Sequence, residues 1–379
     1  MTAIQSTSPP RSPIYEDALL DLFTPAVRED QLHPNFARCL LPGREGEREV
    51  VMAWAEGFKD RDGKLVKEFQ TTFNSTFWEL YLFAVFKAYG FEVDWSQASP
   101  DFVLKTPKGE VVVEAVTANA AQGATPEWAK PTMMTEAVKN KDFNGLNRDA
   151  IIRLSNALLG KLRKFRQSYG DMEHVKGKPF VIAVAPFEQP DFQHQYDRAM
   201  RALLFDEYVD ETAYFKNPEA FPNGPPSVRL GSVEKTNGNT IDLGIFNDDG
   251  WGEVSAVIFS CAATWGKTVA MSNRPGIGFV CTSWGTDASG KSEGRISSIG
   301  IPSESVTDGL QVFHNPRARR PLDREVFRRP GVVQHFAAAG GFERENYDSC
   351  LQFRTSHELV LRDGPGAAVA GGEACGAPG

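Results

Sequence analysis

Apolar residues recur at three- and four-residue spacing between positions 71 and 89, which predicts a helix that ends at Gly90. After this glycine the pattern changes to alternation between apolar and polar positions. The alternation predicts three short strands, over residues 91–95, 100–105 and 110–118. The first unit that the sequence predicts is therefore a helix followed by a small strand meander.

Farther along the chain, the pattern predicts alternating helices and strands. A basic amphipathic helix is expected over residues 148–168 and another helix over residues 192–208. Continuous apolar runs at residues 178–185 and 254–261 are typical of strands that are buried on both faces. These elements predict an α/β fold, with a mixed central sheet flanked by helices.

The same patterns divide the chain into segments. The 379-residue sequence begins with a Ser-, Pro- and Thr-rich stretch and ends with a Gly- and Ala-rich one, both of which we expect to be disordered. The predicted segments are a disordered N-terminus (1–14), a helical lead-in (15–70), the α/β core (71–263), a β-rich or loop extension of the core (264–325), and a peripheral, irregular C-terminal segment with a flexible tail (326–379).

Three carboxylates lie on three successive predicted elements. Glu79 flanks the apolar stripe of the helix, Asp101 begins the second strand, and Glu114 follows three valines in the third strand. A carboxylate in an apolar strand is costly unless it is paired or binds a metal. Taken singly, Asp101 could be a turn cap and Glu79 an ordinary helix residue. Because the strand hairpin lets Asp101 and Glu114 converge, the three acids together predict a divalent-metal site.

A helix acid, Pro100-Asp101 at a strand, and Glu114 on the next strand resemble the motif of the PD-(D/E)xK nuclease-like superfamily. The resemblance covers residues 71–187 well and continues more loosely to about residue 263. It implies a restriction-endonuclease-like core, in which Glu79, Asp101 and Glu114 bind Mg²⁺ or Mn²⁺. It also implies hydrolysis of phosphodiester bonds in nucleic acid, with DNA favoured over RNA as the partner.

The sequence departs from this motif at the lysine, because the position two residues after Glu114 is Val116. Members of the superfamily sometimes carry the lysine on a neighbouring helix. Lys161 lies on the edge of the apolar face of the predicted basic helix and is the best candidate; Lys164 and Arg153 are weaker ones. Alternatively, Lys161 is a solvated lysine whose stem covers apolar surface. In that case the protein would be a catalytically inactive member of the fold that binds nucleic acid or a protein partner.

Composition and charge bear on the partner and the compartment. The net charge of −8 is unusual for a general nucleic-acid binder, but basic residues concentrate in the region 130–178 and again near Arg317–Arg324. No run approaches the ~20 apolar residues of a membrane span, and the N-terminus lacks a signal-peptide layout. The five cysteines show no CxxC spacing, so reduced thiols and a cytoplasmic location are expected.

Two further motifs suggest other functions. Residues 285–292 match the phosphate-loop pattern GxxxxGK[ST], which would make Lys291 and Ser292 part of a nucleotidase. That loop requires a helix directly after it, whereas the residues that follow do not have a helical pattern, so a hairpin turn is the preferred interpretation. His314, before Asn315-Pro316, is interpreted as part of a turn and not as a catalytic residue.

Overall fold

The computed structural model describes residues 20–129, 142–235, 237–286, 291–338 and 341–358. The predicted disorder at residues 1–14 and in the Gly/Ala tail, 364–379, lies outside the described residues. No helix in the described part of the chain is both long enough and apolar enough to cross a lipid bilayer.

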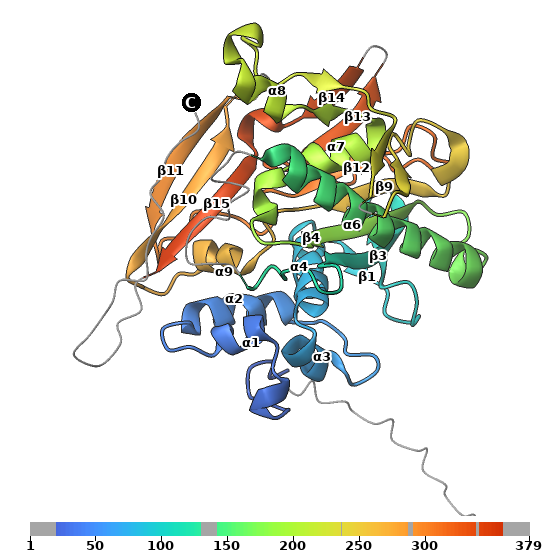
Figure 1. Ribbon diagram of the computed structural model, residues 1–379. Helices are drawn as coiled ribbons and strands as arrows, with labels where there is room; N and C mark the ends of the chain where they lie inside the picture. The colour runs from blue at the N-terminus through green and yellow to red at the C-terminus, as the bar shows by residue number, and fades with distance from the viewer. Residues whose placement is uncertain (1–19, 130–141, 236, 287–290, 339–340, 359–379) are drawn as a thin grey trace, which may run out of the picture.

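A mixed sheet of eight strands forms the centre of the described part of the molecule, in the order β1-β2-β3-β4-β9-β12-β13-β14 (Figure 1). Strand β2 pairs antiparallel with β1 on one side and with β3 on the other, and β3, β4 and β9 are parallel. The predicted α/β class and mixed central sheet are confirmed. The strands of this sheet are β1 (Glu92–Val93), β2 (Phe102–Thr106), β3 (Gly109–Asn119), β4 (Phe180–Phe187), β9 (Val254–Phe259), β12 (Gln311–His314), β13 (Val333–Ala338) and β14 (Gly341–Glu345).

Helices cover both faces of this sheet. The helices are α1 (Pro34–Cys39), α2 (Glu45–Ala55), α3 (Leu65–Thr71), α4 (Asn74–Ala88), α6 (Phe143–Lys164), α7 (Arg198–Phe205), α8 (Glu211–Lys216) and α9 (Trp265–Met271). Side chains of α1–α4 form one apolar core with one face of the sheet, and side chains of α6 and α7 form a second core with the other face. A π-helical turn, Phe165–Tyr169, continues α6.

Strand β3 shows how alternation divides these two cores. Val111 and Val113 lie in the core with α4, whereas Val112, between them, lies in the core with α6. Because side chains alternate along a strand, Glu114 faces the same side as Val112, toward α6. This placement decides which helix can contact the strand carboxylate.

Residues after 263 extend the sheet and add a smaller one. Strands within residues 264–325 agree with the β-rich extension expected there, whereas the strands after residue 326 differ from the irregular C-terminal extension that the sequence predicts. Strands β12, β13 and β14 widen the central sheet, and β10 (Gly278–Gly285), β11 (Ser292–Ser298) and β15 (Leu351–Glu358) form a three-stranded sheet beside it (Figure 1). The four residues of β12 are all buried, so they show no alternation that the sequence could reveal. Two small two-stranded sheets are also present: β5 (Tyr208–Val209) pairs with β6 (Ser227–Val228), and β7 (Ser232–Glu234) pairs with β8 (Thr240–Asp242).

The single helix predicted over residues 192–208 is also wrong, because the chain is broken at Tyr196. A 3₁₀ turn at Phe192–Gln195 precedes this residue and α7 follows it. Tyr196 has a φ of 46°, which helical residues do not adopt. Its buried hydroxyl lies 3.1 Å from Sγ of Cys350, so a tertiary contact accompanies the break.

Candidate carboxylate and lysine site

The β2–β3 hairpin brings Asp101 and Glu114 together. Phe102 of β2 pairs with Val113 of β3, so Asp101, one residue before Phe102, lies beside Glu114 on the face toward α6. Oδ2 of Asp101 accepts a hydrogen bond of 2.7 Å from the backbone N–H of Ala115. The hairpin therefore holds one carboxylate against the backbone next to the other.

Helix α6 supplies two amines to Glu114. Nζ of Lys161 and Nζ of Lys164 each lie 2.8 Å from the same oxygen, Oε1 of Glu114. Glu114 is fully buried, whereas the side chain of Lys161 is 21% exposed and that of Lys164 is 47% exposed. Arg153, the other weaker candidate, instead donates to the backbone oxygen of Asn119. The helix thus delivers two lysines, not one, to the strand carboxylate.

The three acids interact electrostatically, although Glu79 comes from α4 on the opposite face of the sheet. Burial, and then the charge of the neighbouring Asp101, raise the pKa of Glu79 to about 8. Burial, and then the charge of Glu114, raise the pKa of Asp101 as well. Burial acts in the same direction on Glu114, but Lys161 and Lys164 outweigh it and lower the pKa of this carboxyl. The lysines therefore favour the ionised form of Glu114. At Glu79 and Asp101 the nearby positive charge does not outweigh burial, so the neutral form of each carboxyl is favoured more than in water.

Two oxygen atoms beside the lysines have no geometrically good hydrogen bond. Oε2 of Glu114 and the hydroxyl of Tyr169 are buried without such a partner among the described residues. Burial, and then the nearby carboxylate of Glu114, raise the pKa of Tyr169. A buried oxygen without a donor costs free energy, so a cation or a water molecule at Oε2 would be favoured.

The donor set suits a hard cation bound by few protein ligands. Among the described residues, no group of three or more His, Cys, Asp or Glu side chains is arranged to hold a metal ion. The ligand set of Glu79, Asp101 and Glu114 therefore stays a prediction. Magnesium commonly takes only one or two protein carboxylates and keeps several waters. Asp101 and Glu114 share one face of the hairpin and fit that pattern. Glu79 lies on α4, which packs against the other face of the sheet.

Val116 does not supply the missing lysine function. It lies on the same face of β3 as Glu114 and packs, half-buried, against the core that α6 forms with the sheet. Its apolar side chain can neither donate to a phosphate nor orient a water molecule. The amines that contact Glu114 come instead from Lys161 and Lys164 of α6.

The phosphate-loop interpretation lacks its helix. Gly285 ends β10 and pairs with Ser292, the first residue of β11, so a strand follows the motif. Residues 287–290 of the motif lie outside the described residues. His314 is not in a turn, as the sequence suggested, but ends β12, where a ring nitrogen lies 2.8 Å from Oε1 of Gln334. Burial lowers the pKa of this histidine to about 4.

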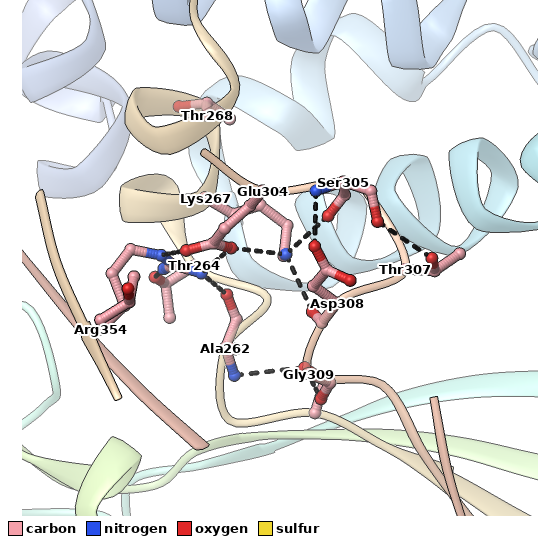
Figure 2. A network of polar contacts seen from close by, with 12 residues as sticks. Ala262, Thr264, Lys267, Thr268, Glu304, Ser305, Thr307, Asp308, Gly309 and Arg354 are labelled. Atoms are coloured by element: carbon pink, nitrogen blue, oxygen red, sulfur yellow. Dashed lines mark hydrogen bonds and ion pairs between the residues drawn. The ribbon is translucent and has the colours of Figure 1, made fainter. Parts of the chain in front are cut away.

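A second polar cluster, around Lys267, is fully internal (Figure 2). Nζ of Lys267 contacts Oε2 of Glu304 at 2.9 Å and the backbone oxygens of Ser305 and Asp308 at 3.1 and 2.9 Å. Arg354 donates to the other oxygen of Glu304 at 2.7 Å. All three amine protons have acceptors, and the amine is completely buried, so no donor remains for a ligand. This cluster joins α9, the loop before β12, and β15, and its role is structural.

Comparison of the chain with protein-family models, with curated proteins and with solved structures finds no match. The function must therefore be argued from the site itself.

Proposed function

We propose that this protein is a metal-dependent nuclease that hydrolyses phosphodiester bonds, with a restriction-endonuclease-like core. The observation that carries the proposal is the contact of Lys161 and Lys164 with Glu114, beside Asp101. A buried carboxylate, a second carboxylate on the same face and an amine from the neighbouring helix are the groups that this chemistry requires. The amines reach the site although the expected lysine position is a valine.

The order of elements supports the same proposal. Helix α4 precedes the antiparallel strands β1, β2 and β3; helix α6 then crosses to β4, which is parallel to β3. These elements carry the motif residues in the order that the superfamily resemblance implies, with helices on opposite faces of the sheet. The order of these elements belongs to the sequence resemblance, and the placement of α4 and α6 on opposite faces of the sheet is the support that geometry adds.

The proposed chemistry is hydrolysis of one P–O bond. Mg²⁺ or Mn²⁺ at Asp101 and Glu114 would lower the pKa of a bound water and stabilise charge on the phosphate. Lys161 holds Glu114 in its ionised form and offers an amine beside the reacting water. The water oxygen bonds to phosphorus and releases its proton to solvent. The bridging oxygen leaves with the bonding electrons and takes up a proton, so a phosphomonoester and a hydroxyl form.

Nucleic acid is the proposed partner because exposed basic side chains lie at the end of α6 in an acidic protein. Arg163 and Lys164 are exposed there, and Lys164 contacts Glu114. Such a local basic surface can bind phosphates despite a net charge of −8. Duplex DNA is the preferred substrate in this proposal. Cys39, Cys261 and Cys350 are buried free thiols, which favours a reducing compartment and thus the cytoplasm.

The second candidate function is an inactive nuclease fold that binds nucleic acid or a protein, and Val116 is the observation that favours it. A cleavage assay distinguishes the active nuclease from the inactive fold. The full chain would be incubated with plasmid DNA and with RNA, in Mg²⁺, in Mn²⁺ and in EDTA. We expect cleavage that requires the metal and is lost in Asp101→Asn, but is kept in the control Asp94→Asn, on an exposed turn. Absence of cleavage in every metal, with nucleic acid still bound, would leave the inactive fold as the better account.

A further inference from the structure

The two lysines at Glu114 are redundant for keeping this carboxylate paired. Both amines bond the same oxygen of Glu114, and the charges of both also act on Asp101. For Glu114 itself, a single amine is enough to compensate the one negative charge of the buried carboxylate. Two cations on one oxygen also repel each other. One lysine could therefore leave without exposing Glu114 to the cost of an unpaired buried charge.

Two other basic side chains near this end of α6 bond acids of their own. Arg166 bonds the carboxylate of Glu253 at 2.8 Å, and Lys178 bonds that of Glu110 at 2.6 Å. If either moved to a ligand, it would leave an acid without its cation. Lys164 differs, because Lys161 remains on the acid that Lys164 would leave.

Exposure identifies which of the two lysines can move. The side chain of Lys164 is 47% exposed and that of Lys161 is 21% exposed, so Lys164 loses less packing when its amine turns to solvent. Its amine also lies 5.5 Å from the centre of the Tyr169 ring. Tyr169 is buried in the π-helical turn after α6, so its ring is a fixed aromatic surface against which the amine of Lys164 packs.

We propose that Lys164 is a releasable phosphate-binding lysine. When nucleic acid binds, its amine leaves Glu114 and donates to a non-bridging oxygen of the phosphodiester, while Lys161 stays on Glu114 as a positioning residue. The role that one lysine has in the motif is thereby divided between two residues of α6. This inference rests on the proposed function and adds the residue that recognises the substrate phosphate.

The test separates binding from cleavage in the full-length protein. Affinity for a fluorescein-labelled DNA duplex is measured across a salt series in Ca²⁺, with cleavage checked to be absent, and single-turnover cleavage is measured in Mg²⁺. Lys164→Met should weaken binding roughly 10- to 100-fold and make the slope of log K against log salt shallower by about 0.9. Lys161→Met leaves Lys164 as the one lysine on Glu114, so this variant should lower the cleavage rate at saturating DNA and should also make the slope shallower. Lys164→Arg should restore the slope, and Lys105→Met, at an exposed pair with Glu92, should change neither quantity.

An unchanged salt slope in Lys164→Met, with wild-type protein that binds and cleaves, overturns this inference and leaves the proposed function intact. A wild-type protein that neither binds nor cleaves DNA or RNA refutes the proposed function, and the inference with it. If Lys164→Met does not fold, Lys164→Gln is measured in its place, with urea unfolding as the check. A folded Lys164→Gln variant whose slope of log K against log salt equals that of the wild-type protein would again overturn the inference.

Discussion

Removal of both lysines from Glu114 should destabilise the protein by more than the sum of the single removals. Methionine is the replacement at each position, because it keeps most of the apolar stem and removes the charge. Either single variant leaves one amine on Oε1 of Glu114, whereas the double variant leaves a fully buried carboxylate with neither amine. The quantity of interest is the coupling free energy between the two substitutions.

The magnitude follows from exposure. Lys164 is nearly half-exposed, so its loss alone should cost about 0.5 kcal/mol, and the more buried Lys161 about 1.5 kcal/mol. Stranding a buried charge costs about 3–5 kcal/mol, so the double variant should lose about 4 kcal/mol at neutral pH. The coupling is then about 2 kcal/mol. Without its amines Glu114 would have a raised pKa, and the penalty should disappear below about pH 4, where the carboxyl is protonated in both states.

Urea unfolding of the four proteins at pH 7, followed by tryptophan fluorescence, measures this coupling. The matched control is the pair Lys64→Met and Lys105→Met. These exposed lysines hold different acids, Asp62 and Glu92, so their effects should add within about 0.5 kcal/mol. Additive effects of Lys161→Met and Lys164→Met would refute the shared pairing of Glu114 and, with it, the redundancy on which Lys164 could be released.

Two further predictions concern buried charges away from the site. Lys267→Met should destabilise the protein by about 3 kcal/mol, because it removes a fully buried cation that bonds Glu304 and two backbone oxygens. The control Lys105→Met, at an exposed pair, should cost less than about 1 kcal/mol in the same urea assay, and equal losses would contradict the structural role of Lys267. Glu188→Gln should remove a pH dependence, since burial raises the pKa of Glu188 from 4.5 to about 7 and the folded state therefore holds its proton more tightly. As the pH rises from 4.5 to about 7, the free energy of unfolding of the wild-type protein should fall by up to about 3 kcal/mol through this group, and the variant should lack that component. Identical pH profiles of unfolding in the two proteins would contradict this expectation.

The elements around the site could be predicted because each has an apolar pattern of its own. The helix expected at 71–89 is α4, the hairpin strands are β2 and β3, and the buried run at 178–185 is β4. Within these elements, the alternation of β3 places Glu114 on a definite face. Strand β12 could not be predicted in the same way, because a short strand with every residue buried carries no period.

The partners of the charged groups were harder to predict than the elements. Helical spacing places Lys161 at the edge of the apolar face and makes Lys164, about one turn farther on, a weaker candidate for the same role. Its contact with Glu114 depends on where α6 crosses β3, which is set by tertiary packing. The cluster of Lys267, Glu304 and Arg354 was missed for the same reason, since its members come from three separate segments and Glu304 and Arg354 are 50 residues apart. Complementary charges at such separations give no local signal.

The central claim, that Asp101 and Glu114 bind a divalent cation, is tested most directly by anomalous diffraction from crystals of the full-length protein soaked in Mn²⁺. The account predicts an anomalous peak about 2.1 Å from carboxylate oxygens of both residues. The peak should be absent from Asp101→Asn crystals and retained in crystals of the control Asp94→Asn. Crystals soaked in Mn²⁺ with no peak at these carboxylates, or a peak that persists unchanged in Asp101→Asn, would contradict the account.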